Sequence, residues 1–276
     1  MKRICIIIIL IPIIYSGVYS QSSQSLISGK SLLQQQGITQ LNNILDSFIL
    51  KLPTYGIIGI GNVNTEAFKE INSSGKLSGY IRPIKKRNYY LNVNFSFNVN
   101  ATNNDSLLAG TFLFPDVGTN SFYSSVDFNY KFKSTGKELH FICPFFEFAN
   151  KSVKGRIEDS TRYFSTLSYT FGCRYQFLFL NDDEKVSFSI APFYSIINVP
   201  DEDNEDYRYL FSKDIYSTLS SSIKSVGVKI AFQYNNFQIF ADMRHVLGND
   251  KTVPLRELKG FNSNIGVTFN ASIFEK

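Results

Sequence analysis

The sequence contains no tryptophan, two histidines and three cysteines among its 276 residues. It has no CxxC motif and no cluster of cysteine with histidine, so no zinc site is predicted. His140 and His245 fall in different strand registers, and no Ser/His/Asp set converges on one end of the expected fold. The sequence therefore predicts neither an enzyme nor a cofactor.

A strong charge of one sign is also missing, because the formal net charge is only +5. The one short basic run, Lys85-Lys86-Arg87, has the character of a turn rather than a nucleic-acid patch, so no nucleic-acid partner is expected. After the first residues, no segment is apolar enough for a membrane helix. The mature chain is therefore either exported and soluble or inserted in a membrane as a barrel.

The first residues have the three parts of a secretory signal peptide. Lys2 and Arg3 precede an apolar run from Ile4 to Tyr15, and small residues follow up to Ser20. The apolar run is too short for a spanning helix, which needs roughly 20 apolar residues. We predict a signal peptide over residues 1–20, cut after Ser20.

From Tyr55 onward, the sequence alternates apolar and polar residues in long segments. The run from Tyr89 to Asn100 does so almost without fault, and Tyr163–Phe179 and Val226–Tyr234 repeat the pattern. A period of two is that of a strand with one apolar and one polar face. Ten strands are predicted near residues 55–63, 76–84, 88–100, 121–132, 137–148, 162–180, 186–197, 216–234, 237–247 and 260–274.

The connections between these predicted strands alternate in length. Short ones lie at 85–87, 133–136, 181–185 and 235–236, and long ones at 64–75, 101–120, 149–161, 198–215 and 248–259. Transmembrane β-barrels have short turns on one side of the membrane and long loops on the other. Several segments also match the ~9–11 residues that cross a bilayer at a tilt. Residues 55–276 therefore predict an all-β fold, an antiparallel up-and-down transmembrane β-barrel of about ten strands.

The two faces of each predicted strand suit lipid and a wet interior. In the segment 162–180, one register holds Tyr169, Phe171 and Cys173, and the other holds Thr170 and Arg174. Tyrosine and phenylalanine also crowd the short turns, which is the position of an interfacial aromatic belt. Without tryptophan, these two residue types carry the belt alone.

Over residues 55–274, the chain resembles the bacterial outer-membrane β-barrel proteins in its alternation, its loop pattern and its final amphipathic strand. With Gln21 after the signal cut, it looks like the short-looped barrels of Bacteroidota-type bacteria. The resemblance implies a location in the bacterial outer membrane, with both mature termini in the periplasm. It also implies outer-membrane lipid and the barrel-assembly machinery as partners. Barrels of this family often end in an aromatic residue that the machinery reads, whereas here Glu275-Lys276 follow Phe274.

Residues 21–54 form a separate N-terminal segment. Apolar residues recur at helical spacing from Ile38 to Ile49, and Pro53 ends the pattern. We expect one amphipathic helix near residues 38–51. Its apolar stripe would be buried against the lumen, a periplasmic partner or the membrane interface.

Charged residues on the polar face of the expected strands form a candidate network inside the lumen. Buried charges must pair or stay hydrated, and a barrel of about ten strands lies near the size that side chains fill. A structural network is therefore favoured over the lining of a narrow pore. The members of this network are Asp127, Lys131, Glu138, Arg174, Lys229, Asp242 and Arg244.

The segment 137–148 fits this scheme badly. Turning Glu138 and His140 inward also turns Phe146 and Phe148 inward, with Ile142 and Pro144, and sends Glu147 towards lipid. A bulge near Pro144 would shift the register. Alternatively, an apolar inner patch receives the N-terminal helix as a plug.

An acidic loop and two cysteines are the remaining candidates. Five acidic residues occupy the six positions from Asp201 to Asp206, and Asp201, Asp203, Glu205 and Asp206 have the oxygen ligands that Ca²⁺ prefers. The loop lacks the glycine of an EF-hand, so a solvated acidic loop is favoured. Cys143 and Cys173 both lie in apolar registers and are either inert apolar residues or a disulfide pair.

The sequence thus predicts an outer-membrane β-barrel with an envelope-structural or small-solute pore role. The alternative is a surface adhesion or ligand-binding barrel that acts through loops 101–120, 149–161 and 198–215. A weaker alternative is a soluble exported β-sandwich.

Overall fold

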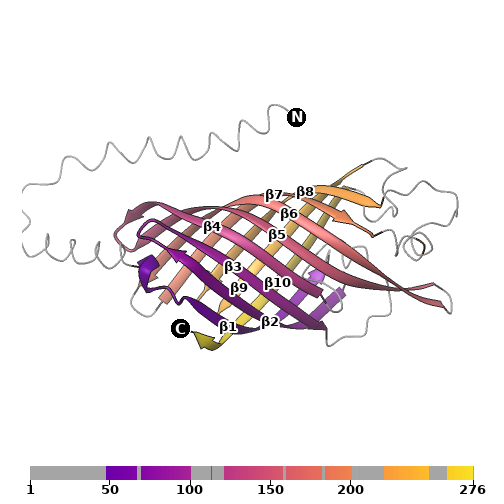
Figure 1. Ribbon diagram of the computed structural model, residues 1–276, viewed down its shortest axis with the longest axis horizontal. Helices are drawn as coiled ribbons and strands as arrows, with labels where there is room; N and C mark the ends of the chain where they lie inside the picture. The colour runs from indigo at the N-terminus through magenta and orange to yellow at the C-terminus, as the bar shows by residue number, and fades with distance from the viewer. Residues whose placement is uncertain are drawn as a thin grey trace, which may run out of the picture. The chain divides into compact units, whose positions relative to one another are not determined.

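The computed structural model of the chain is a β-barrel of ten strands (Figure 1). The structure describes residues 48–66, 70–100, 113, 121–157, 160–181, 184–200, 205, 221–248 and 260–275. The predicted signal peptide, residues 1–20, and residues 38–47 of the predicted helix lie outside this part. No described helix is long and apolar enough to cross a membrane. The strands are β1 (Tyr55–Glu66), β2 (Glu70–Lys85), β3 (Tyr89–Asn100), β4 (Ser121–Thr135), β5 (Glu138–Ile157), β6 (Ser160–Asn181), β7 (Glu184–Asn198), β8 (Ser222–Tyr234), β9 (Phe237–Leu247) and β10 (Gly260–Glu275).

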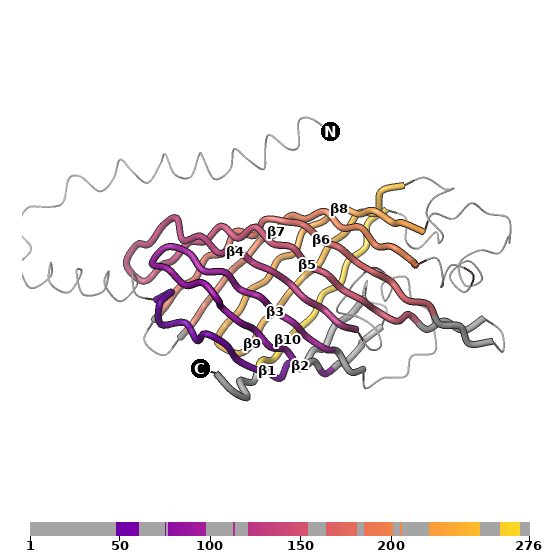
Figure 2. Tube along the Cα trace, viewed as in Figure 1, coloured from indigo at the N-terminus to yellow at the C-terminus, as the bar shows by residue number. Residues whose placement is uncertain are grey.

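Each strand pairs antiparallel with the strands that precede and follow it, and β1 closes the ring by pairing with β10. Figure 2 traces this up-and-down course from the indigo first strand to the yellow last one. The predicted all-β, ten-strand barrel is confirmed. Because one continuous ring has no free edge, the β-sandwich alternative is wrong.

The barrel wall separates an apolar outer face from a largely polar inner one, as the two-residue alternation predicted. On β4, Asp127 and Asn129 are buried inside, whereas Phe128 and Tyr130 are exposed outside. The outer face of the other strands carries the same kind of large apolar side chain, including Leu77, Phe95, Phe97, Ile142, Phe171, Phe188, Ile190, Phe232, Ile239, Val267 and Phe269.

Two of the short turns are built by residues with positive φ. Asn235 has φ 50° between β8 and β9, and Gly136 has φ 59° between β4 and β5. Two-residue hairpins favour such residues because their backbone twist then matches that of the strands. The Asn235 side chain links this turn to the start of β7, because its Oδ1 accepts a hydrogen bond from the Lys185 amide at 2.8 Å.

Two of the predicted long loops are wrong, because the strands continue through them. Residues 67–69 alone join β1 to β2, and residues 158–159 alone join β5 to β6. The predicted loop 149–161 is instead a β-hairpin in which residues as far as Ile157 and Ser160 pair with each other. β4 pairs with β5 only as far as Lys151, and β7 with β6 only as far as Leu167.

The predicted inward register of β5 is also wrong. Leu139, Phe141, Cys143 and Phe145 face inward, and they are 0–7% exposed. Glu138 and His140 therefore lie in the outward register, and neither the bulge near Pro144 nor an inward Phe146 is found. The assumption that polar residues face the lumen fails here because this part of the inner wall is apolar.

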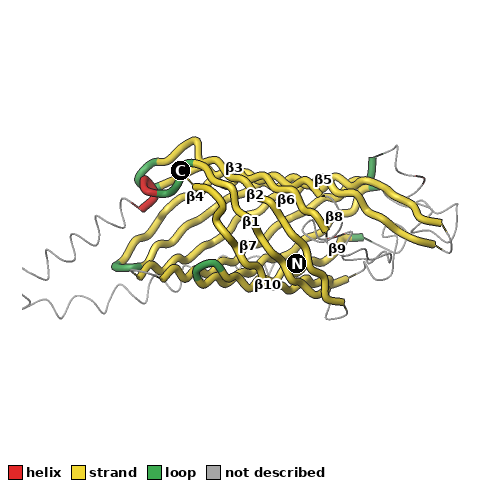
Figure 3. The backbone as a smooth tube through the Cα atoms, turned by 90° about the horizontal axis from the view of Figure 1, so that it is seen from below, coloured by secondary structure: helices red, strands yellow, loops and turns green. Residues whose placement is uncertain are grey.

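The apolar patch on β5 packs against Ile49, which lies in a short helical turn just before the first strand of the barrel. Ile49, which is 0% exposed, packs with Leu139, Phe141 and Cys143, and Tyr90 and Leu178 border the cluster. Figure 3 shows the helical turn in red at the end of the barrel that carries the short turns.

The link from this helical turn to β1 is held by two basic side chains of β2. Arg82 donates a hydrogen bond to the Pro53 carbonyl at 2.6 Å, and Lys85 donates one to the Leu52 carbonyl at 2.7 Å. The described end of the predicted helix is therefore fixed at this end of the barrel, with Ile49 against the inner face of β5.

Candidate functional site

Three ion pairs lie on the inner wall, further from the short turns than the Ile49 cluster. Lys229 on β8 donates to both carboxylate oxygens of Glu147 on β5, at 2.8 and 2.6 Å. β6 and β7 lie between these two strands, so the pair spans the inner space. Arg244 on β9 donates from Nε and Nη2 to the two oxygens of Asp242, at 3.0 and 2.8 Å, and its side chain is 0% exposed.

The third pair joins Arg174 on β6 to Asp127 on β4, with 3.7 Å between Nη2 and Oδ2. Asparagine side chains of β3 complete the surroundings of this carboxylate. Asn94 donates to Asp127 Oδ2 at 2.9 Å, and Asn92 in turn donates to Asn94 Oδ1 at 2.8 Å. The cation and the amide donor replace part of the hydrogen bonding that this buried carboxylate would otherwise have with water.

Two phenylalanine rings lie between the three cations. The Lys229 ammonium is 5.9 Å from the centre of the Phe145 ring and 5.6 Å from that of Phe193. The Arg174 guanidinium is 6.0 Å from Phe145, and the Arg244 guanidinium is 4.9 Å from Phe193. We call these five residues and the three carboxylates the lumen ladder. Its rings attract the cations through their negative faces.

Each ring of the ladder lies over a glycine on the neighbouring strand. Phe145 pairs with Gly172 across β5 and β6, and Phe193 pairs with Gly227 across β7 and β8. A Cβ atom on either glycine would overlap the facing ring. The absence of a side chain therefore lets the ring lie flat against the wall, where it contacts the cations.

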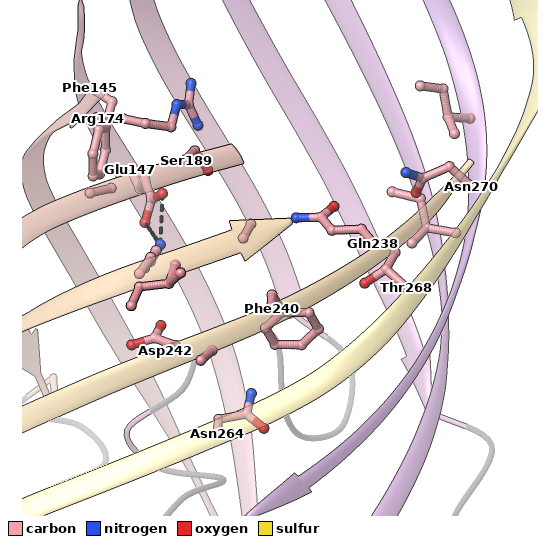
Figure 4. Close-up of a pocket in the computed structure, with 17 residues that line it drawn as sticks. Phe145, Glu147, Arg174, Ser189, Gln238, Phe240, Asp242, Asn264, Thr268 and Asn270 are labelled. Carbon is pink, nitrogen blue, oxygen red and sulfur yellow. Dashed lines mark hydrogen bonds and ion pairs between the residues drawn. The ribbon is translucent and has the colours of Figure 1, made fainter. Parts of the chain in front are cut away.

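A cavity of about 350 Å³ opens beside the ladder in the middle of the barrel (Figure 4). Glu147, Arg174, Lys229 and Asp242 line one side of it, so its charged lining is balanced. The other polar groups of the lining are amides and hydroxyls. The buried Oδ1 of Asn264 faces this cavity without a hydrogen bond from the described residues, which leaves it an acceptor for water. The amide and hydroxyl lining comes from Gln238, Asn264, Thr268, Asn270 and Ser189.

The structure brings five of the seven predicted network residues together in the ladder: Asp127, Arg174, Lys229, Asp242 and Arg244. Lys131 is buried on the same inner wall, nearer the short turns. The prediction is wrong for Glu138, which lies outside with His140. Sequence reasoning missed Glu147 because it placed that residue towards lipid. Glu147 shares its inward register with Ala149 and Lys151, whose burial is evident only in the structure.

The other candidates of the sequence are placed as follows. Of the four acidic residues proposed for Ca²⁺, only Glu205 belongs to the described part, where it is exposed, and Asp201, Asp203 and Asp206 lie outside it. No group of three or more metal-binding side chains occurs among the described residues. Cys143 is buried and faces inward, whereas Cys173 is exposed on the outer face, so both are free thiols.

No family model matches the chain, and no curated protein sequence matches it. Solved structures do resemble it. The β domain of the Bordetella autotransporter Brka is 9% identical over 78% of this chain and 99% of its own, with a TM-score of 0.32. LpxR from Salmonella typhimurium is 6% identical over 77% and 99%, with a TM-score of 0.28. The NanC porin is 10% identical over 77% and 98%, with a TM-score of 0.24.

At these scores the likeness is one of general architecture alone. The solved structures that resemble this chain are bacterial outer-membrane β-barrels, and the chain shares with them a closed, antiparallel β-barrel.

Proposed function

We propose that the protein spans the bacterial outer membrane as an envelope-structural barrel whose lumen is closed to steady solute flow. The Glu147–Lys229 pair is the observation that carries this proposal. It joins strands that are not neighbours, so it crosses the inner space that a solute would use. Ile49 packs against the inner wall of β5, nearer the short turns. A narrow barrel whose charges pair across the interior is a filled barrel rather than a channel.

The membrane location is supported by the outer face. Phe97, Phe171 and Phe269 expose half or more of their surface, and they belong to an apolar band that runs around the barrel. A continuous apolar surface of this kind is rare on soluble monomers and usual on lipid-facing barrels. The full-length mature chain should migrate faster on a denaturing gel before boiling than after it. Extraction in buffer without detergent would contradict the proposal.

Recording in planar lipid bilayers tests whether the lumen is closed. The mature protein should give no steady conductance. The double variant Glu147→Gln, Lys229→Gln should give brief openings, because the bridge across the lumen is then lost while Ile49 stays in place. A steady, ion-selective current from the unaltered protein would instead establish the small-solute pore.

The barrel would stand with its short turns and both mature termini in the periplasm, and the assembly machinery and outer-membrane lipid would be its partners. The location of Ile49 and β10 supports this orientation, because the chain enters the barrel at the end that carries the short turns. An epitope placed within residues 101–120 should be accessible on intact cells. One placed after Lys276 should become accessible only after the outer membrane is permeabilised.

A surface interaction role is the second candidate, and the β5–β6 hairpin favours it. β5 and β6 have 20 and 22 residues, whereas ~9–11 residues cross a bilayer. Figure 1 shows the hairpin running past its neighbours. Shortening it between Ser152 and Ser165 should abolish attachment of cells to other cells or to matrix proteins if this role is correct. The loops 101–120 and 198–215 proposed for the same role would be deleted in parallel.

A further inference from the structure

A β-bulge shapes the outer face of the barrel near the short turns. Lys131 of β4 pairs with Phe141 of β5, but the next pair joins Lys133 to His140, so Phe132 is an extra residue. Strict alternation would turn Lys133 into the lumen after Lys131. The bulge instead exposes both Phe132 and Lys133 on the outer face, beside His140.

His140 lies at the centre of a cluster of aromatic rings on that face. Its ring centre is 5.2 Å from that of Phe177 and 5.9 Å from that of Phe132. Its Nδ1 shares a hydrogen bond of 2.8 Å with the Tyr175 hydroxyl. These contacts fix the imidazole, so its other nitrogen is aimed in one direction.

That other nitrogen, Nε2, lies 3.7 Å from Glu138 Oε2. The Glu138 side chain is 44% exposed, so its carboxylate is also open to a partner from outside. Lys133 lies on the neighbouring strand, two residue pairs away from Glu138, and the described residues show no ion pair between the two. Diagonal neighbours of this kind lie about 7–8 Å apart at their Cα atoms.

The cluster therefore presents an acid, a base and three aromatic rings at the edge of an apolar surface. On β5 and β6, the outward positions that follow it are apolar or aromatic, with Ile142, Phe146 and Phe171 among them. In the proposed membrane orientation, this cluster beside the β4–β5 turn would lie where the barrel passes from lipid tails to headgroups.

We propose that this cluster binds the headgroup of a phosphatidylethanolamine-type lipid. The lipid ammonium lies against the Glu138 carboxylate and the rings of Phe177 and Tyr175, and cation–π attraction adds to the ion pair. The lipid phosphate accepts hydrogen bonds from the Lys133 ammonium. A two-carbon spacer separates the two charges of this headgroup, which suits the diagonal spacing of Glu138 and Lys133.

Charge complementarity selects this lipid over an anionic one. A phosphatidylglycerol headgroup also offers a phosphate to Lys133, but it has no cation for Glu138 and leaves that carboxylate unpaired. Because a headgroup docks from the membrane, the inference rests on the proposed membrane location. It does not depend on whether the lumen conducts.

Native mass spectrometry of the refolded mature protein in detergent micelles tests the proposal, with phosphatidylethanolamine and phosphatidylglycerol titrated separately. The unaltered protein should bind the first phosphatidylethanolamine about fivefold more tightly than the first phosphatidylglycerol. Glu138→Gln should remove this preference and leave phosphatidylglycerol binding unreduced. Lys133→Gln should weaken both. The matched control, Lys224→Gln, removes an exposed lysine from β8 near the opposite end and should change neither.

Equal binding of the two lipids by the unaltered protein would overturn the proposal. So would an unchanged preference in Glu138→Gln, or a loss in Lys224→Gln as large as that in Lys133→Gln. The gel shift on boiling, measured for each variant, separates these results from misfolding. A protein that shows no such shift and needs no detergent would fail the proposed membrane location instead.

Discussion

Glu147 and Lys229 form an ion pair whose two residues belong to strands separated by two others in the barrel. Their side chains are 12% and 26% exposed. The substitution Glu147→Gln leaves the Lys229 ammonium largely buried without its full counter-charge. We expect it to lower the free energy of unfolding by about 2–4 kcal/mol. Urea unfolding in lipid vesicles, followed by circular dichroism, would measure this loss.

The control for this substitution is the double variant Glu147→Gln, Lys229→Met, which removes the stranded charge as well. It should recover part of the lost stability, because an apolar side chain is cheaper to bury than an unpaired ammonium. If the loss in the double variant equals the sum of the losses in Glu147→Gln and Lys229→Met alone, the two residues do not stabilise one another.

The glycines beneath the ladder rings give a second prediction. In Gly172→Ala, the new Cβ would overlap the Phe145 ring and lie 2.7 Å from the Pro192 carbonyl oxygen. Moving the ring should destabilise the barrel by about 1–3 kcal/mol. The pair Gly172→Ala, Phe145→Leu should lose less than the sum of its single variants. An unaffected Gly172→Ala protein in the same urea experiment would count against close packing of ring and glycine.

The sequence was sufficient for the barrel because alternation is a local signal. The outward Phe128 and the inward Asp127 differ by one position, and a strand has only two faces. The lumen ladder could be predicted only in part. The inward position of its carboxylate Glu147 depends on the register of β5, whose inward residues Leu139, Phe141 and Cys143 pack against Ile49, a residue far from β5 along the chain.

The lengths of two connections were mispredicted for a related reason. Residues 149–157 alternate as a strand does, and Ala149, Lys151 and Val153 are all buried on one face. Charged and small residues suggested a loop, and pairing with β6 overrode that suggestion. The bulge at Lys133 has no signal in the sequence, because it follows from how β4 pairs with β5.

Ile49 gives a third prediction. It is fully buried against Leu139, Phe141 and Cys143, so Ile49→Ala should cost about 2–4 kcal/mol of stability. Ile49→Asp would place a carboxylate in an apolar cluster and should drive the segment out of the lumen. Limited proteolysis at Lys51 should then accelerate in Ile49→Asp relative to the unaltered protein. A control at the exposed Leu50, Leu50→Asp, should leave that rate unchanged.

The two cysteines give a fourth prediction. Cys143 faces the lumen and Cys173 faces outward from the adjacent strand, so their Cβ atoms point apart. Oxidation of the folded protein should form no disulfide within the chain. After unfolding in denaturant, both thiols of the mature chain, which lacks Cys5, should react with a maleimide whether or not the protein was oxidised. A faster-migrating band on a non-reducing gel, absent in Cys143→Ser, would show that the two sulfurs do meet.

Ile49 is tethered, and the tether decides how the lumen mouth behaves over time. Only five residues, Leu50 to Thr54, separate it from Tyr55, the first residue of β1. A side chain that is displaced but held by so short a linker keeps an effective concentration in the millimolar range at its binding site. Displacement of Ile49 is therefore brief and reverses by itself. A ligand that competes for the apolar patch on β5 would have to bind it more tightly than a side chain that remains attached nearby.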